Sequence, residues 1–284
     1  MMMRTVIDVR SIRHNFGEKV VLDHVNFQIS KGEIFGLLGP SGAGKTTLIK
    51  ILTGQLRPAA GESTLLGKES VNLTGNDYRK IGIMMDNFGL YERLNCYDNL
   101  KFYTMINGIP TERIDEVLEK VGLIDARKTI VSNLSKGMRS RLLLARGILC
   151  EPEVLFLDEP TSGLDPMTTE EIHKLILEEK AKGTTIFLTT HNMAEAEKLC
   201  DNVALLNEGK IVEYGNPKET CRKYNHQKKI LLHLYDGSEV ILQHDKTSIE
   251  KLVSYLENGE LETIHSTEPN LETVFIELTG RKLD

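Results

Sequence analysis

Long apolar runs are missing from this chain of 284 residues. No stretch approaches the roughly 20 apolar residues that a membrane-spanning helix needs. The start, MMMRTVIDVR, also lacks the apolar core of about 7–15 residues that is typical of a signal peptide. We therefore expect neither a membrane span nor a secretory leader.

Cysteines and clustered positive charges are also scarce. The four cysteines, Cys96, Cys150, Cys200 and Cys221, lie far apart without a C-x-x-C pair, so we expect reduced thiols of a cytosolic protein rather than disulfides or a zinc site. The net charge is −6, and no block of lysine and arginine is long enough to follow a phosphate backbone. This pattern disfavours nucleic-acid binding as the main function.

The segments that are present indicate an α/β protein. Short β-like runs occupy the first 35 residues, and helical spacing of apolar residues dominates a helical insert at about residues 87–150. Apolar strands at 153–160 and 184–190 then flank a helical segment, which predicts a mostly parallel sheet covered on both faces. We expect an antiparallel β subdomain at the N-terminus, a main domain over residues 4–221 and a small α+β appendage over 222–284.

A glycine-rich stretch, GLLGPSGAGKTTL at residues 36–48, follows a short apolar strand and opens a helix. Glycines let the backbone approach a ligand closely, and a helix N-terminus favours an anion. The spacing Gly39-x-x-x-x-Gly44-Lys45-Thr46 fits the P-loop, with lysine for the β- and γ-phosphates and the Thr46 hydroxyl for Mg²⁺. The sequence therefore predicts a P-loop NTPase that binds a nucleotide triphosphate with Mg²⁺. The residues expected to hold the nucleotide here are Gly39, Pro40, Ser41, Gly42, Ala43, Gly44, Lys45, Thr46 and Thr47.

A second phosphate motif, VLFLDEPTSGLDP, places Asp158 and Glu159 at the end of an apolar strand. Ligands of open α/β sheets bind beyond the carboxyl ends of strands. Asp158 is suited to hold Mg²⁺, and Glu159 is suited to accept a proton from water that attacks the γ-phosphate. His191 follows the next buried strand, where it would orient the γ-phosphate or that water. We expect Lys45, Glu159 and His191 to be catalytic. The alternative for Asp158 and Glu159 is that they only cap the strand before a turn, and the P-loop makes this alternative less favoured.

The segment NLSKGMRSRLLLARGIL resembles the L-S-G-G-Q signature of ATP-binding cassette (ABC) ATPases: Leu134, Ser135 and Gly137 match, whereas Lys136 and Met138 depart. The resemblance covers residues 4–220. It implies that the substrate is ATP, that Phe16 stacks on adenine and that Ser162–Asp165 form the D-loop. It also implies a head-to-tail pair of cassettes, which we expect to be a homodimer, with Ser135, Gly137 and Asp165 completing the nucleotide sites.

One departure falls where the family usually has glutamine, after the strand that precedes the helical insert. Here the residue is Asp86. A carboxylate can bind Mg²⁺ but cannot donate a hydrogen bond, and Asn87 would substitute if the loop shifts. We expect Asp86 to contact the nucleotide and the metal, and hydrolysis to survive with an altered rate or coupling.

The resemblance also implies a membrane permease as partner, and the aromatic-rich segment 87–103 is our candidate docking surface. The alternative is that Phe88, Tyr91, Tyr97 and Phe102 belong partly to the core. The ending EPNLETVFIELTGRK resembles cassettes that serve exporters of drugs, antibiotic peptides or lipids. We therefore expect an ATP-hydrolysing subunit at the cytoplasmic face of the cell membrane, held there only through the permease. Two alternatives stay open: a soluble cassette that acts on ribosomes or DNA, and a nucleotide-gated sensor with weak turnover.

Overall fold

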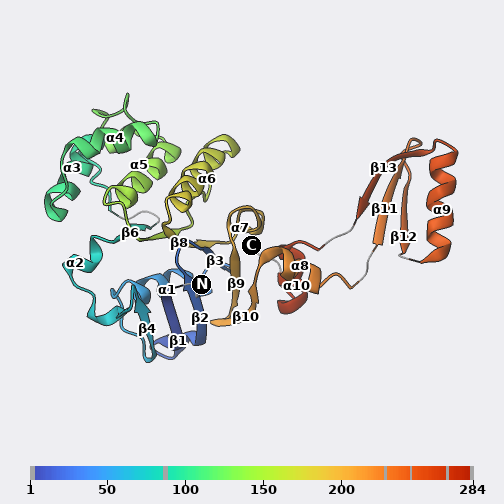
Figure 1. Cartoon of the computed structure of the whole chain (residues 1–284), viewed down its shortest axis with the longest axis horizontal. Helices are drawn as coiled ribbons and strands as arrows, with labels where there is room; N and C mark the ends of the chain where they lie inside the picture. Colours follow the sequence, from blue (N-terminus) through green and yellow to red (C-terminus); the bar gives the residue numbers. More distant parts are fainter. Residues whose placement is uncertain (1–3, 86–88, 227–228, 244, 267–268, 282–284) are drawn as a thin grey trace. The chain divides into compact units, whose positions relative to one another are not determined.

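The computed structural model describes residues 4–85, 89–226, 229–243, 245–266 and 269–281 (Figure 1). Contacts between residues divide the chain into two units, with the division between Gly215 and Asn216. Asp86, Asn87 and Phe88 lie outside the described residues.

A six-stranded sheet forms the centre of the first unit, in the order β10-β9-β3-β8-β7-β6. Its strands are β3 (Ile34–Leu38), β6 (Ile81–Met84), β7 (Val154–Asp158), β8 (Thr185–Thr190), β9 (Asn202–Asn207) and β10 (Lys210–Gly215). The pairs from β9 to β6 are parallel, and β10 joins antiparallel through a hairpin. Every residue of β3, β7 and β8 is buried, as continuous apolar strands of a doubly covered sheet require. The expected mostly parallel sheet is confirmed.

An antiparallel sheet in the order β2-β1-β4-β5 packs on the same core. Its strands are β1 (Thr5–Phe16), β2 (Lys19–Ser30), β4 (Ala60–Leu65) and β5 (Lys68–Glu69). Aromatic contacts join the two sheets: the Phe27 and Phe35 rings stack with centroids 4.8 Å apart, and the Phe27 and Phe187 centroids are 6.1 Å apart. The antiparallel subdomain is therefore built onto the parallel sheet by shared apolar packing.

Helices of the first unit flank these sheets. They are α1 (Lys45–Leu52), α2 (Gly75–Tyr78), α3 (Cys96–Asn107), α4 (Glu112–Lys120), α5 (Lys136–Ile148), α6 (Pro166–Ala181) and α7 (Met193–Leu199), with 3₁₀ turns at Ser70–Asn72 and Val131–Asn133. Figure 1 shows α3, α4 and α5 gathered in one lobe, which corresponds to the expected helical insert.

Thr111 directly precedes α4, but its side chain accepts no capping hydrogen bond. A capping side chain needs an extended backbone at the cap position. Thr111 has helical dihedral angles instead, with φ of −68° and ψ of −24°.

The second unit contains α8 (Pro217–Lys223), β11 (Lys229–Leu234), β12 (Glu239–Gln243), α9 (Lys246–Glu257), β13 (Leu261–Ser266) and α10 (Leu271–Thr279). Its strands form an antiparallel sheet in the order β12-β11-β13. A tight turn connects β11 to β12, with Gly237 at φ of 83°. In neither unit does a described helix combine the length and the apolar character that crossing a membrane would take.

Candidate nucleotide site

The glycine loop between β3 and α1 is held against neighbouring backbone. A β-carbon at Gly39 would collide with the Leu206 carbonyl of β9. Gly44 has φ of 111°, and a β-carbon there would lie 2.9 Å from the Val21 carbonyl oxygen. Only glycine fits these two positions, so the glycines that define the motif also fix its loop in place.

Lys45, the first residue of α1, is buried with 7% of its side chain exposed. Its Nζ donates to the Gly39 carbonyl at 2.7 Å and to the Pro40 carbonyl at 3.2 Å. The same Nζ lies 3.0 Å from Oε1 of Glu159. The loop, its lysine and the acidic residue after β7 therefore converge on one point.

Thr46 and Asp158 form the second contact between the two motifs. The Thr46 hydroxyl donates to Oδ2 of Asp158 at 2.8 Å, and the Thr189 hydroxyl of β8 donates to Oδ1. Asp158 is 5% exposed. Mg²⁺ in phosphate sites is usually held by one or two carboxylates, hydroxyls, waters and the phosphates themselves. A single buried carboxylate beside a hydroxyl fits that pattern. Among the described residues no cluster of three or more histidine, cysteine, aspartate or glutamate side chains could hold a metal without the phosphates.

Glu159 and His191 lie in direct contact. Nδ1 of His191 is 2.7 Å from Oε2 of Glu159, and the Glu159 backbone N–H donates to the Thr189 carbonyl at 3.0 Å. Glu159 has a left-handed backbone with φ of 51°, which is uncommon for a residue other than glycine. This turn directs the carboxylate to both Lys45 and His191.

A cavity of about 350 Å³ opens above these residues. Its lining residues are Phe16, Val21, Ser41, Gly42, Gly44, Lys45, Thr46, Thr47 and Glu159. The Phe16 ring is 56% exposed and packs edge-on against His14, with centroids 4.8 Å apart. An open aromatic face next to backbone N–H groups offers stacking for a base and donors for phosphates.

Ser135, Gly137 and Asp165 do not occur among the described residues that line this cavity. They form a second group, in which Ser135 caps α5 by accepting from the Met138 N–H at 3.2 Å. Asp165 caps α6, and hydrogen bonds from the Thr168 hydroxyl and backbone hold the pKa of its carboxyl below the usual value. A β-carbon at Gly137 would lie 2.8 Å from Cγ2 of Thr168, so α5 and α6 begin side by side.

Arg146 of α5 contacts two described backbone carbonyls, at Ile83 and at Gly89. The Arg146 guanidinium of α5 donates to the Ile83 carbonyl at 3.3 Å and also to the Gly89 carbonyl. These two bonds join β6 and Gly89 to α5.

Val21, His14 and Thr189 were not expected from the sequence. The sequence could have pointed to Thr189 as a site residue, since it is one of two threonines that interrupt the apolar pattern at the end of β8. No sequence pattern pointed to Val21 and His14, because they reach the site only through the pairing of β1 with β2.

Comparisons with known proteins agree with this geometry. The model of the family described as "ABC transporter" matches residues 22–162. The chain is 41% identical to a fluoroquinolones export ATP-binding protein of Mycobacterium tuberculosis, over 98% of this chain and 94% of the relative. It is 35% identical to a bacitracin transport ATP-binding protein of Bacillus licheniformis, over 98% of each chain. A solved ATP-binding subunit of an ABC transporter superposes with a TM-score of 0.71 at 28% identity, covering 77% of this chain and 93% of that one.

Proposed function

Because this chain belongs to the ABC transporter family and hydrolyses ATP as a transporter's ATP-binding subunit, we propose that it powers export of a drug or antibiotic peptide through a separate membrane permease. The relatives that match nearly the whole chain carry fluoroquinolone export and bacitracin transport in their names. Their similarity extends through the second unit, which supports the exporter assignment beyond the ATP-binding unit alone.

We assign the steps of hydrolysis to residues of this chain. Phe16 stacks on adenine, the loop N–H groups and Lys45 hold the phosphates, and Thr46 with Asp158 would hold Mg²⁺. When bound, Mg²⁺ adds positive charge beside the phosphates and favours charge build-up on their oxygens. Glu159 accepts the proton of the attacking water, and its contact with His191 keeps the carboxylate directed toward the γ-phosphate.

The second residue group supports a head-to-tail dimer. Ser135, Gly137 and Asp165 gather at the N-termini of α5 and α6, apart from the cavity of their own chain. Helix N-termini attract anions, so in a homodimer this group closes over the phosphates that the partner's loop holds. Each nucleotide then bridges two chains, and hydrolysis separates them.

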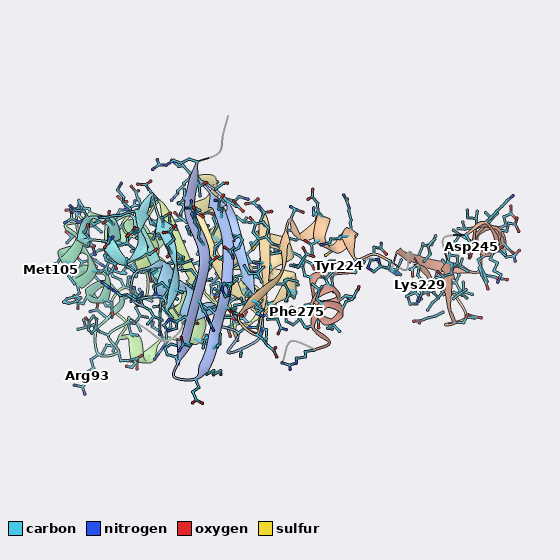
Figure 2. All side chains as sticks on the ribbon, turned by 90° about the horizontal axis from the view of Figure 1, so that it is seen from below. Arg93, Met105, Tyr224, Lys229, Asp245 and Phe275 are labelled. Atoms are coloured by element: carbon cyan, nitrogen blue, oxygen red, sulfur yellow. The ribbon has the colours of Figure 1, made fainter. Side chains whose placement is uncertain are left out.

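The permease is proposed to dock on the helical insert, which would place the subunit at the cytoplasmic face of the membrane. Large apolar side chains of this lobe are exposed: Tyr91 51%, Phe102 44%, Met105 72% and Ile106 64%. The Tyr91 and Phe102 rings contact each other with centroids 5.2 Å apart, and Met105 lies at the outer edge of the lobe (Figure 2). Tyr97 is half-buried beneath Arg127 and does not contribute.

The contact between Lys45, Glu159 and His191 is the single observation that carries the proposed mechanism. The test compares phosphate release and ATP-dependent dimerisation of wild type and Glu159→Gln. We expect the variant to lose about 10²–10⁴-fold in kcat and to accumulate as an ATP-bound dimer in size-exclusion chromatography. A variant that hydrolyses ATP at the wild-type rate would refute the role of Glu159. Export is tested by accumulation of a fluorescent fluoroquinolone in cells that express the chain with its permease.

A further inference from the structure

A buried carboxylate lies behind the proposed catalytic pair. Glu195 of α7 is 2% exposed, and its Oε1 accepts a hydrogen bond from the Thr161 hydroxyl at 2.6 Å. Nε2 of His173, on α6, lies 3.0 Å from the same oxygen. His173 and Thr161 are themselves buried, at 5% and 8% exposure. One side chain thus joins α6, α7 and the loop that follows β7.

Two of the segments that Glu195 joins carry the catalytic pair. Thr161 follows Glu159 by two residues, and the Ser162 N–H donates to the Glu159 carbonyl at 3.2 Å. On the other side, the Glu195 N–H donates to Oδ1 of Asn192 at 3.1 Å, which is the residue after His191. The network therefore connects the backbone next to Glu159 with the backbone next to His191.

Glu159 needs such support because of its conformation. Its backbone has φ of 51°, and residues in such sparsely populated regions keep them only where the surroundings hold them. Burial, the largest influence, raises the pKa of the Glu195 carboxyl, but hydrogen bonds from His173 and Thr161 outweigh it and the pKa lies below its usual value. The group is therefore an anionic acceptor, and hydrogen bonds to charged groups are the stronger kind.

We propose that Glu195 is a positioning residue for ATP hydrolysis, whose buried carboxylate holds the Thr161 segment and the His191 segment in the register that keeps Glu159 and His191 in contact. The inference rests on the catalytic roles proposed above for those two residues. Glu195 itself contacts neither of them in the structure and acts through the backbone on both sides.

A matched control lies on α6, the helix that also carries His173. Glu179 of α6 is also a buried carboxylate, 3% exposed, and it is paired with Lys120 and Lys182. Glu179 precedes the start of β8, whereas His191 and Glu195 follow its end. The Glu179 and Glu195 carboxylates therefore belong to opposite ends of the strands. Loss of Glu179 disturbs a comparable buried network without touching the catalytic edge.

The experiment uses the full chain and measures kcat, KM for ATP and the thermal unfolding midpoint. Thr161→Val removes only a hydroxyl and leaves Glu195 paired with His173. We expect this variant to lose about tenfold or more in kcat, since small misplacements of catalytic groups cost about that much or more. Its KM should stay close to that of wild type, and its unfolding midpoint should fall by no more than that of Glu179→Gln. Thr161→Ser should restore kcat, and Glu195→Gln should lower it in the same way.

The control variant Glu179→Gln should lower the unfolding midpoint while it keeps kcat. Wild-type kcat in both Thr161→Val and Glu195→Gln would overturn the inference. A loss that Thr161→Ser does not rescue, or that Glu179→Gln reproduces, would assign Glu195 to stability alone and overturn it too. Wild-type turnover in Glu159→Gln would instead overturn the proposed catalytic roles, whatever the Thr161 variants show.

Discussion

Burial orients the Lys45 side chain for phosphate binding. Its ammonium contacts two carbonyls of the loop and the Glu159 carboxylate, and only 7% of the side chain is exposed. A cation held in this way is already oriented when phosphates enter the cavity. Hydrogen bonds to charged groups contribute about 1.5–3 kcal/mol each.

We expect Lys45→Ala to weaken ATP binding by about 10–100-fold, which corresponds to the loss of one such bond. Titration with a fluorescent ATP analogue measures the effect. Lys50→Ala is the matched control, because it removes the same charge from the same helix outside the loop. Equal affinities of Lys45→Ala and wild type would contradict the assignment.

The cysteines give a residue-scale prediction with a defined pH dependence. Burial raises the pKa of the Cys150 thiol to about 11. The thiolate is the reactive form, so at pH 8 only about one thousandth of Cys150 is reactive. We expect alkylation by iodoacetamide to be about a hundredfold slower than in the denatured chain, and to rise tenfold per pH unit toward pH 11. Mass spectrometry of the alkylated peptide checks this; a rate equal to that of the denatured chain would contradict it.

Residue-level prediction is strongest where one short segment contains the whole signal. The glycine loop defines its own geometry, and Asp158 and Glu159 adjoin a strand end that meets it at one edge of the sheet. Thr161 and Glu195 could not be paired in advance, because their contact depends on how α7 packs after β8. The roles of all the site residues, including Asp86, Ser135 and Asp165, remain predictions.

At the scale of elements, close packing of β6 against α5 depends on two glycines. A β-carbon at Gly82 would collide with the Gly147 carbonyl and lie 2.7 Å from Cδ1 of Leu155. We expect Gly82→Ala to destabilise the first unit by about 1–3 kcal/mol through overpacking. Gly75→Ala, at a position with no neighbouring atoms within 4 Å, is the control and should change stability by less. Urea denaturation measures both, and equal midpoints would show that β6 and α5 can move apart freely.

Long elements were predictable because their patterns repeat. The buried strands β3, β7 and β8 contain continuous apolar runs, and α6 is long enough to show helical spacing over several turns. The helix α8 was missed, since seven residues span about two turns and its evident sequence signal was Asn216 followed by proline. The presence of the long elements followed from the periodicity of their apolar residues. Short helices depend instead on their caps and on contacts with the rest of the fold.

At the scale of the whole molecule, the two units have very different cores. The core of the first unit extends across both sheets and includes Phe35, Phe156 and Phe187, all fully buried. The small sheet of the second unit has three buried leucines, Leu232, Leu234 and Leu242, and α9 has no buried residue. Burial of apolar area is the main stabilising contribution in both, so the small sheet should open at a lower free energy.

Native-state hydrogen exchange tests this difference in the intact chain. We expect the amides of β11 and β12 to exchange at least tenfold faster than those of β3 and β8, which are buried in the centre of the parallel sheet. Leu232→Ala should speed exchange within the small sheet and leave β3 unchanged, because the two cores share no residues. If both sheets exchanged together and responded together to this substitution, the chain would unfold as one cooperative body. Separate exchange would mean that the second unit can rearrange while the nucleotide site stays folded.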